Sequence, residues 1–494
     1  MIKWNVLAPI LVYVAGMIVI GYYANKKKGP AKNFLEGFFL GGRNLGPILL
    51  AFTMAATAVS ASHFLGAPGM VYKVGFGFFL VGLCQFPLLF YCLGALGKKM
   101  SIIARRINAI TITDIFRARF ENHVLTIGSA LAIIVFITVA MSAQIIGGAR
   151  IIESLTGLPY LWGLLIFLPI IVIYIAIGGF MGDVWTDLIQ GAIMVAGSVL
   201  LLILTVVKGG GLANMTMTIA GTNPQLLALP GPMGMTPLFL FSFFLLFGLG
   251  VLAYPPMTVR AMVFKDSRSM HRAIIIGSFI MLFFVILLPL VGFLGRYYFP
   301  NIDVPDKIIP SVVMKVFPAW LGGIFLTVPL AAGMSTIDSM FLVIVASIVR
   351  DIFQNYIKPN ASEKLLSRMS YVLTFAVAVV IFLLAYTPPK LLVMIVIFAG
   401  AGVGVSVFMP LIFGLYWRRA TGWGAACSFL GGLISYILLE KFVTKPLGMI
   451  PYVPSLGISI ILMIVVSLLT KKPKVETISL FWGSTPFSSL KKNT

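Results

Sequence analysis

The sequence predicts an all-α integral membrane protein with about 13 membrane-spanning helices. Of its 494 residues, 60% are hydrophobic and only 10% are charged, and the mean hydropathy is +1.06. A water-soluble core of this size has no use for so much apolar surface, whereas the interior of a bilayer requires it. The apolar segments lack the alternation typical of membrane β-barrels, so each must satisfy its own backbone as a helix.

Thirteen apolar segments can each cross the hydrocarbon core of a bilayer, which takes roughly 20 residues of helix. Their connections are too short to fold as separate soluble domains, so we expect a single membrane domain. In chain order the segments lie near residues 7–23, 48–70, 76–97, 124–147, 160–180, 187–207, 236–258, 273–297, 319–347, 369–386, 391–416, 424–441 and 451–470.

The net charge of +22 would suit a protein that binds nucleic acid, but the distribution of the charge excludes that role. With the N-terminus placed outside, the cytoplasmic segments hold 26 of the 36 Lys and Arg residues. This asymmetry follows the positive-inside rule and predicts a multi-pass protein of the cytoplasmic membrane with its C-terminus inside. The connection between the fifth and sixth segments is the exception, because it carries Asp183 and Asp187 and no basic residue.

Two segments contain helix-breaking residues at equivalent positions. The second is interrupted at Gly66-Ala-Pro-Gly69, and the seventh at Gly248-Leu-Gly250 and Tyr254-Pro-Pro256. Proline lacks a backbone donor and glycine tolerates unwinding, so both helices can be discontinuous within the membrane. Because the breaks are five segments apart, they indicate two five-helix halves of inverted orientation, a pattern typical of transporters. Two kinks without function are the alternative, since Gly and Pro are common in membrane helices.

The predicted organisation has six parts. They are an N-terminal extra helix with a basic loop (1–44), the first five-helix repeat (45–207), an external loop (208–235), the second five-helix repeat (236–416), two flanking helices (417–470) and a basic, loosely ordered cytoplasmic tail (471–494).

The ninth segment carries an acidic residue deep inside it. A carboxylate such as Asp338 at that depth costs about 2.5–3.5 kcal/mol, so we expect it to face a partner or a polar path. On a helix, Ser335, Asp338 and Ser339 share one face. The carbonyl of Ala332 lies one turn earlier, where the hydroxyls of Ser335 and Thr336 can reach it.

These oxygens suit a small monovalent cation. Unwound carbonyls of the second segment, such as those of Ala56 and Val59, lose their helical donors and can turn toward the same ion. Neutral oxygens favour such an ion, whereas a cage of carboxylates would favour Ca²⁺ or Mg²⁺. In the alternative interpretation, the hydroxyls only bond back to their own helix, as Ser and Thr usually do in membrane spans.

Asp187, near the start of the sixth segment, has two interpretations. It either stabilises the start of a helix through the helix dipole or has a functional role. In the functional interpretation, it joins Asp338 and Ser339 in a second cation site or forms part of the exit route of the ion. The sequence shows no nucleophile–base pair, metal cluster or phosphate-binding loop, so we expect a transporter and not an enzyme. A transport-inactive membrane sensor or scaffold is the alternative from another class, and no appended signalling domain is visible to support it.

Several motifs resemble the sodium:solute symporter family along nearly the whole chain. Gly66-Ala-Pro-Gly69, Ile177-Gly-Gly-Phe180 and Gly414-Leu-Tyr-Trp-Arg-Arg-Ala-Thr421 are similar to family-wide motifs, as is the stretch around Asp338. Phe39-Leu-Gly-Gly-Arg43, among others, resembles the branch of the family that transports pantothenate.

The resemblance implies a LeuT-like fold of two inverted five-helix repeats and Na⁺-coupled uptake of pantothenate by alternating access. Its implied partners are Na⁺, the small-molecule substrate and the bilayer, and a monomer can suffice. Another small carboxylate or an amino acid such as proline, with Na⁺ or H⁺ as the coupling ion, is the alternative.

The resemblance also implies three groups of site residues. The common sodium site consists of Ala56, Val59, Ala332, Ser335 and Thr336. A second candidate cation site consists of Asp187, Ser335, Asp338 and Ser339. The candidate substrate pocket consists of Thr53, Thr57, Ser60, Gln144, Phe247 and Val251.

Overall fold

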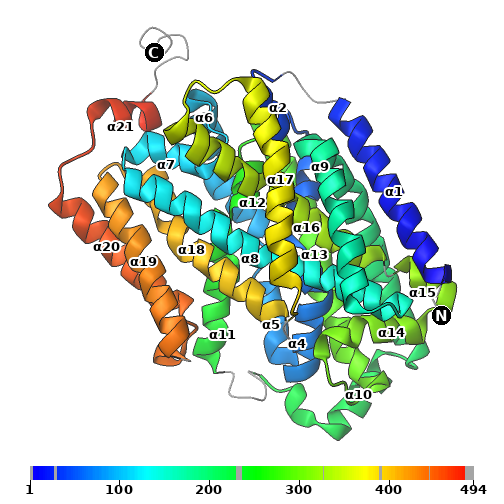
Figure 1. Cartoon of the computed structure of the whole chain (residues 1–494). Coiled ribbons are helices and arrows are strands. Elements are labelled where there is room, and N and C mark those ends of the chain that lie inside the picture. Colours follow the sequence, from blue (N-terminus) through cyan, green and yellow to red (C-terminus); the bar gives the residue numbers. More distant parts are fainter. Residues whose placement is uncertain are drawn as a thin grey trace.

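The structure, a computed structural model, is a bundle of helices (Figure 1). Within the part of the chain that it describes, all regular structure is helical, and a single β-bridge joins Leu45 to Phe264. The prediction of an all-α fold is therefore confirmed. The described residues are 4–26, 31–229, 236–325, 327–388, 392–443 and 445–483.

Long helices form the body of the bundle, and short helices gather at its two ends. In Figure 1, α2, α6, α7 and α21 lie at one end, and α10 and α14 lie at the other. The long helices are α1 (Trp4–Lys26), α3 (Pro47–Ala58), α8 (His123–Thr156), α9 (Tyr160–Lys208), α13 (Ser267–Tyr298), α16 (Thr327–Ala346), α17 (Glu363–Ala385), α18 (Leu392–Tyr416), α19 (Gly422–Phe442) and α20 (Tyr452–Leu469).

The shorter helices complete the bundle and its connections. The α-helices among them are α2 (Phe34–Leu40), α4 (Ala67–Val74), α5 (Phe76–Leu83), α6 (Lys98–Ile107), α7 (Ile112–Phe120), α10 (Leu212–Thr222), α11 (Pro237–Phe244), α12 (Pro255–Arg260), α14 (Ile308–Val316), α15 (Ala319–Phe325) and α21 (Val475–Trp482). The π-helical segments are η1 (Ser62–Gly66), η2 (Phe90–Gly97), η4 (Leu245–Leu249) and η7 (Ser347–Ile357). The 3₁₀ turns are η3 (Pro224–Leu226), η5 (Gly250–Ala253), η6 (Pro305–Lys307) and η8 (Pro446–Gly448).

Eight helices of the described residues are long and apolar enough to cross a membrane, or nine if the bent pair α3 and α4 forms one span. This number is smaller than the thirteen spans that the sequence predicts. One reason is α9, a run of 49 residues that covers both the fifth and the sixth predicted segments. Gly179 interrupts this run with a left-handed backbone conformation (φ 52°, ψ −159°), which glycine adopts without steric cost.

The second predicted span is broken, but not where its glycines and proline suggest. Helix α3 ends at Ala58, and the next residue, Val59, is extended (φ −90°, ψ 104°). The helix axes on the two sides of this break are bent by 59° relative to each other. The expected break at Gly66–Gly69 is wrong, because Gly66 is helical and Pro68 lies in the first turn of α4. Proline costs no intrahelical hydrogen bond at such a position.

Side chains replace the lost helical partners at this break. The N–H of Ser60 donates to His63 Nδ1 (3.2 Å), and the N–H of Ala61 donates to Gln144 Oε1 (2.9 Å). Buried backbone donors need such partners, because an unpaired one is costly. The acceptor side chains therefore fix the position of the break.

The predicted interruption of the seventh span is present in the structure. Between α11 and α12 the chain forms the π-helical η4 and the 3₁₀ turn η5, and Tyr254 is extended (ψ 120°) before Pro255. Proline disfavours a helical conformation in the residue before it, which explains the position of the step.

Helix α16 is the centre of the bundle. In the most apolar stretch of Thr327–Ile357, which is α16 with η7, 94% of the residues are buried inside the protein. The corresponding share is 33–67% in the other helices that are long and apolar enough to span a membrane. It packs against α8, α9 and α3. A polar side chain on α16 therefore faces protein and not lipid.

The C-terminal region contains more order than the sequence predicts. Where a loosely ordered tail is expected, the structure contains α21, and Phe481 of this helix is buried. The rest of the predicted tail, 484–494, lies outside the described residues.

Candidate functional site

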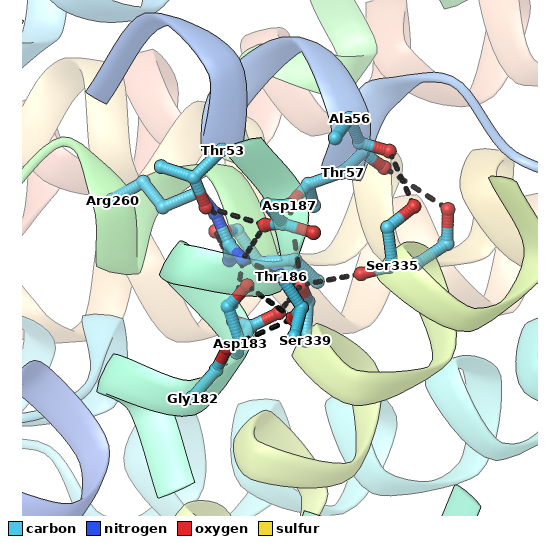
Figure 2. Close-up of polar contacts among 12 residues, drawn as sticks. Thr53, Ala56, Thr57, Gly182, Asp183, Thr186, Asp187, Arg260, Ser335 and Ser339 are labelled. Carbon is cyan, nitrogen blue, oxygen red and sulfur yellow. Dashed lines mark hydrogen bonds and ion pairs between the residues drawn. The ribbon is translucent and has the colours of Figure 1, made fainter. Parts of the chain in front are cut away.

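The ninth segment and the broken second span meet through neutral oxygens. The Ser335 hydroxyl lies 3.0 Å from Ala56 O and 3.1 Å from Ala332 O. The Thr336 hydroxyl lies 3.1 Å from Ala332 O and 3.4 Å from Thr57 O. Figure 2 shows Ser335 reaching from its helix toward the carbonyl of Ala56. The hydroxyls therefore do more than bond back to their own helix, because each one also contacts α3.

Four of the five residues of the expected sodium site are joined by these contacts. The fifth, Val59, is fully buried and lies at the break itself. The site contains carbonyl and hydroxyl oxygens and no carboxylate. The described residues contain no group of three or more His, Cys, Asp or Glu that could hold a metal ion. This donor set fits a weakly held monovalent cation better than a divalent one.

A buried charge cluster lies next to this oxygen site (Figure 2). Arg260, at the end of α12, donates through Nη2 to Asp183 (2.6 Å), Asp187 (3.2 Å) and Ser339 Oγ (2.6 Å). Its Nε donates to Thr53 Oγ1 (2.8 Å), and that hydroxyl donates to Asp187 (2.6 Å). The guanidinium thus joins residues of α3, α9 and α16.

Asp338 has no such partner. Its side chain is fully buried within electrostatic range of Asp183, Asp187, Arg260 and Tyr174. Tyr174 is a hydrogen-bonding group beside it, but neither carboxylate oxygen makes a close hydrogen bond among the described residues. If all groups were ionised, three carboxylates against one guanidinium would leave a formal charge of −2. Unpaired buried charge is expensive, so this region needs a further cation or protons.

The second candidate cation site is assembled only in part. Ser335 and Ser339 are one turn apart on α16, and the Ser339 hydroxyl lies 3.0 Å from Ser335 O. Asp187 is near Ser339, but Arg260 lies between their polar groups. Asp187 also lies eight residues beyond the bend at Gly179 and is fully buried, so a role as a simple helix cap is excluded.

A cavity of about 80 Å³ lies between the two broken helices. Five residues of the expected substrate pocket line it. They are Thr57, Ser60, Gln144, Phe247 and Val251. Thr53 does not, because its hydroxyl belongs to the charge cluster. Thr336 lines the same cavity, so the expected sodium site and the cavity share a wall.

His63 and Gln85 complete the polar wall of the cavity. His63 Nδ1 accepts from the Ser60 N–H, so this nitrogen carries no proton. Its Nε2 then carries the proton and donates to Gln85 Oε1 (2.8 Å). A neutral imidazole is thereby held in one tautomer, and no Lys or Arg lines this cavity among the described residues.

Sequence reasoning missed two groups that the structure brings to the site. Nothing in the sequence identified Arg260 as the partner of Asp183 and Asp187. The connection that carries these two aspartates contains no basic residue, so their counter-ion had to come from another segment. Gln85 gave no signal either, because it contacts His63 only through the tertiary fold. Arg150, outward of the cavity, lies 4.0 Å from Asp306 and not at the cavity wall.

Two interrupted helices around a cavity, with neutral oxygens beside it that suit a monovalent cation, are an arrangement typical of secondary transporters. The family model of the sodium:solute symporter family matches residues 38–432, and the chain belongs to that family. The expectation of a transporter rather than an enzyme is therefore confirmed.

Three known proteins show how close the similarity is. The chain is 39% identical to the sodium/pantothenate symporter of Escherichia coli (strain K12), over 93% of this chain and 96% of that protein. It is 30% identical to the osmoregulated proline transporter OpuE of Bacillus subtilis (strain 168), over 97% of each. A solved Na⁺-coupled sialic acid symporter, in a substrate-bound outward-open state, has the same fold, with a TM-score of 0.79, 19% identity, and coverage of 95% of this chain and 98% of that one.

The charge cluster gives the first testable prediction. In Arg260→Gln, Asp183 and Asp187 lose their buried counter-ion, which costs about 3–5 kcal/mol when one partner of a buried pair is removed. We expect the thermal unfolding temperature of the purified protein to fall by several degrees, and R260Q/D183N to recover part of the loss. Arg268→Gln, an exposed arginine at the start of α13, is the matched control. An unchanged unfolding temperature in R260Q would contradict this account of the cluster.

Proposed function

We propose that this chain is a Na⁺-coupled symporter of pantothenate in the cytoplasmic membrane and that it works by alternating access. One observation carries the proposal most directly: the Ser335 hydroxyl connects the carbonyls of Ala56 and Ala332 across two helices. The 39% identity to a sodium/pantothenate symporter over nearly the whole chain supports the choice of substrate.

The proposed architecture has thirteen spans, with two inverted five-helix repeats at 45–207 and 236–416 in a LeuT-like arrangement. Helix α9 supports the larger number, because 49 residues would be about 74 Å long if straight, more than twice a hydrocarbon core of about 30 Å. Its bend at Gly179 separates two spans. Thirteen spans place the N-terminus outside and the C-terminus inside, as the distribution of Lys and Arg requires.

Sodium would close the second span against α16. Ala56 and Val59 supply carbonyls from the broken helix, and Ala332, Ser335 and Thr336 supply a carbonyl and two hydroxyls from α16. The hydroxyl protons now bridge these oxygens, and rotation of the hydroxyls would turn lone pairs toward the ion. Binding would therefore replace weak hydrogen bonds between α3 and α16 by ion contacts and hold the helices together.

Pantothenate would occupy the cavity between the two breaks. Its amide and hydroxyl groups match the amides of Gln85 and Gln144 and the hydroxyl of Ser60. With no cationic side chain in the wall, the nearest positive charge for its carboxylate is the sodium ion beside Thr336. Substrate and ion would then stabilise each other, which is the basis of coupling. The aliphatic Val251 leaves room for a substrate longer than proline.

Asp338 and Asp187 are proposed to hold a second cation, with Ser335 and Ser339. The unpaired oxygens of Asp338 and the formal charge of −2 support this role. A small cavity lined by Arg260 and Ser339 extends from this region toward Thr111, and it provides an exit route. One Na⁺ with one monoanion is electroneutral, whereas a second cation makes uptake sensitive to voltage by about 2.3 kcal/mol per 100 mV.

Two other functions are considered. The 30% identity to a proline transporter supports a related symporter of a small amino acid on the same scaffold. Proton coupling through Asp338 would keep the fold and the substrate but change the ion. A transport-inactive sensor finds no support in the assembled cavity and ion site.

The second testable prediction concerns the substrate and the ion. We expect purified protein in proteoliposomes to accumulate radiolabelled pantothenate when an inward Na⁺ gradient is imposed, and to leave proline outside. A pH gradient in Na⁺-free buffer should give no accumulation. Proline uptake would favour the amino-acid function, and uptake driven by protons alone would replace Na⁺ as the coupling ion.

The third prediction tests the sodium site. Ser335→Ala with Thr336→Ala removes two oxygens, so the Na⁺ concentration for half-maximal uptake should rise by about tenfold or more, as expected when about 1.4 kcal/mol of ion binding is lost. Ser370→Ala with Thr374→Ala is the matched control, because this buried pair bonds only to its own helix, α17. Unchanged Na⁺ dependence in S335A/T336A would remove the site from the mechanism.

A variant of the cavity completes this design. Val251→Trp fills space in the substrate cavity, so it should raise the pantothenate concentration for half-maximal uptake more than the Na⁺ concentration for half-maximal uptake. In S335A/T336A, the Na⁺ concentration for half-maximal uptake should rise more than that of pantothenate. Equal effects of V251W on both ligands would argue against separate sites.

The fourth prediction concerns Asp338. If it holds the second cation, Asp338→Asn should lower the Hill coefficient for Na⁺ from about 2 toward 1 and abolish stimulation by an interior-negative potential. The control is Asp303→Asn, an exposed aspartate. A Hill coefficient near 1 in the unmodified protein, with no response to potential, would contradict the second cation.

A further inference from the structure

A basic cavity lies at one end of the bundle, far from the ion and substrate sites. Its volume is about 580 Å³, and it opens where α20 ends, α19 begins and α7 leads into α8. In Figure 1 this place lies beside α21, at the end of the molecule that also holds α6 and α7. The distribution of Lys and Arg predicts that this end faces the cytoplasm.

The lining of this cavity carries an excess of positive charge. Four basic residues, Arg119, Lys471, Lys472 and Lys474, line it together with one acid, Glu121, so the formal charge is +3. Glu121 is already paired, because Lys474 Nζ lies 2.5 Å from its carboxylate and holds the pKa of Glu121 below its usual value. Among the described residues, no carboxylate pairs with the other three cations.

Arg119 is built into the wall of the cavity. Its side chain is only 2% exposed, and it donates to the carbonyls of Gly414 (3.0 Å), Trp417 (3.1 Å) and Arg418 (3.3 Å). Its Nη1 is buried and has no hydrogen-bond partner. A cation fixed in this way is positioned before any ligand binds, unlike the exposed lysines around it.

The start of α19 adds a partial positive charge to the same wall. This 21-residue helix begins at Gly422, which lines the cavity. The Thr421 hydroxyl accepts from the Gly424 N–H (3.1 Å), so the helix end is capped and held in place. An anion at such an end is stabilised by the helix dipole.

Two exposed apolar residues show that the cavity borders lipid as well as water. Trp423 is 60% exposed and Leu469 is 81% exposed, and both line the cavity. Each lies at the end of a helix long and apolar enough to span the membrane. Tryptophan in such a position typically marks the level of the lipid headgroups.

We infer that this cavity binds the phosphate of an anionic phospholipid of the phosphatidylglycerol type, with the acyl chains passing Trp423 and Leu469. Charge selects the headgroup, and the apolar rim favours a lipid over a free anion. The bound lipid would join α7, α18 and α19, because Arg119 of α7 holds the end of α18 and the start of α19 lies in the same wall. The inference rests on the fold and the membrane location and does not depend on which solute is transported.

The fifth prediction tests this lipid site in the full-length protein. Phosphatidylglycerol should raise the thermal unfolding temperature of the detergent-purified chain, and phosphatidylcholine should raise it much less. In Lys471→Gln with Lys472→Gln, the phosphatidylglycerol concentration that gives half of the rise in unfolding temperature should increase by about 10-fold to 30-fold. The reason is that each lysine near an anionic surface contributes about 1 kcal/mol to binding. Lys441→Gln with Lys445→Gln, near the opposite end of α19, should behave like the unmodified protein.

Three outcomes would overturn the inference. An unchanged response of K471Q/K472Q to phosphatidylglycerol would place the lipid elsewhere. Equal stabilisation by phosphatidylcholine would show that the acyl chains and not the charge are recognised. Full stabilisation by inorganic phosphate or glycerol phosphate at the same concentration would make the site one for free anions.

Discussion

One buried guanidinium group, that of Arg260, joins α3, α9 and α16 in the interior of this bundle. Thr53, Asp183 and Asp187 come from the first predicted repeat, and Arg260 and Ser339 come from the second. The side chains of the cluster are at most 2% exposed, so its charges must be balanced mainly by one another. Because one arginine faces three acids, the cluster creates a demand for cations next to the place where neutral oxygens can bind one.

The side chains that accept the free N–H groups at the break in the second span also form part of the cavity wall. Gln144 and His63 accept the two N–H groups that the helix no longer satisfies, and both side chains also line the cavity. A ligand that contacts these side chains therefore acts directly on the unwound backbone. The carbonyls of Ala56 and Val59, which lie next to the same break, belong to the proposed ion site. In that proposal, the cavity and the ion site would be linked through the residues of this one chain segment.

The polar face of α16 could be predicted from helical periodicity alone. Contacts between segments far apart in the sequence could not be predicted in this way. Ser335, Asp338 and Ser339 follow the helical repeat, so their common face could be derived from the sequence. Gly66–Gly69 misled the prediction of the break, because a π-helical turn before Pro68 accommodates the proline, with the Ala67 N–H bonded to Ser62 O. The helix breaks instead where His63 and Gln144 supply acceptors, and residues 83 positions apart meet there only after folding.

The two ion-related clusters lie along a single line of contact between α3 and α16. Along α3, Ala56 O lies 3.0 Å from Ser335 Oγ and Thr57 Oγ1 lies 3.2 Å from Ser339 Oγ, both on α16. One turn earlier, Thr53 contacts Arg260 of α12. A movement of α3 away from α16 would separate Ala56 from Ser335 and Thr57 from Ser339 together. Ser339 links the two clusters, because it contacts both Thr57 of α3 and Arg260 of the charge cluster. The cavity adjoins the same contact between α3 and α16, since Thr57 and Thr336 both line it.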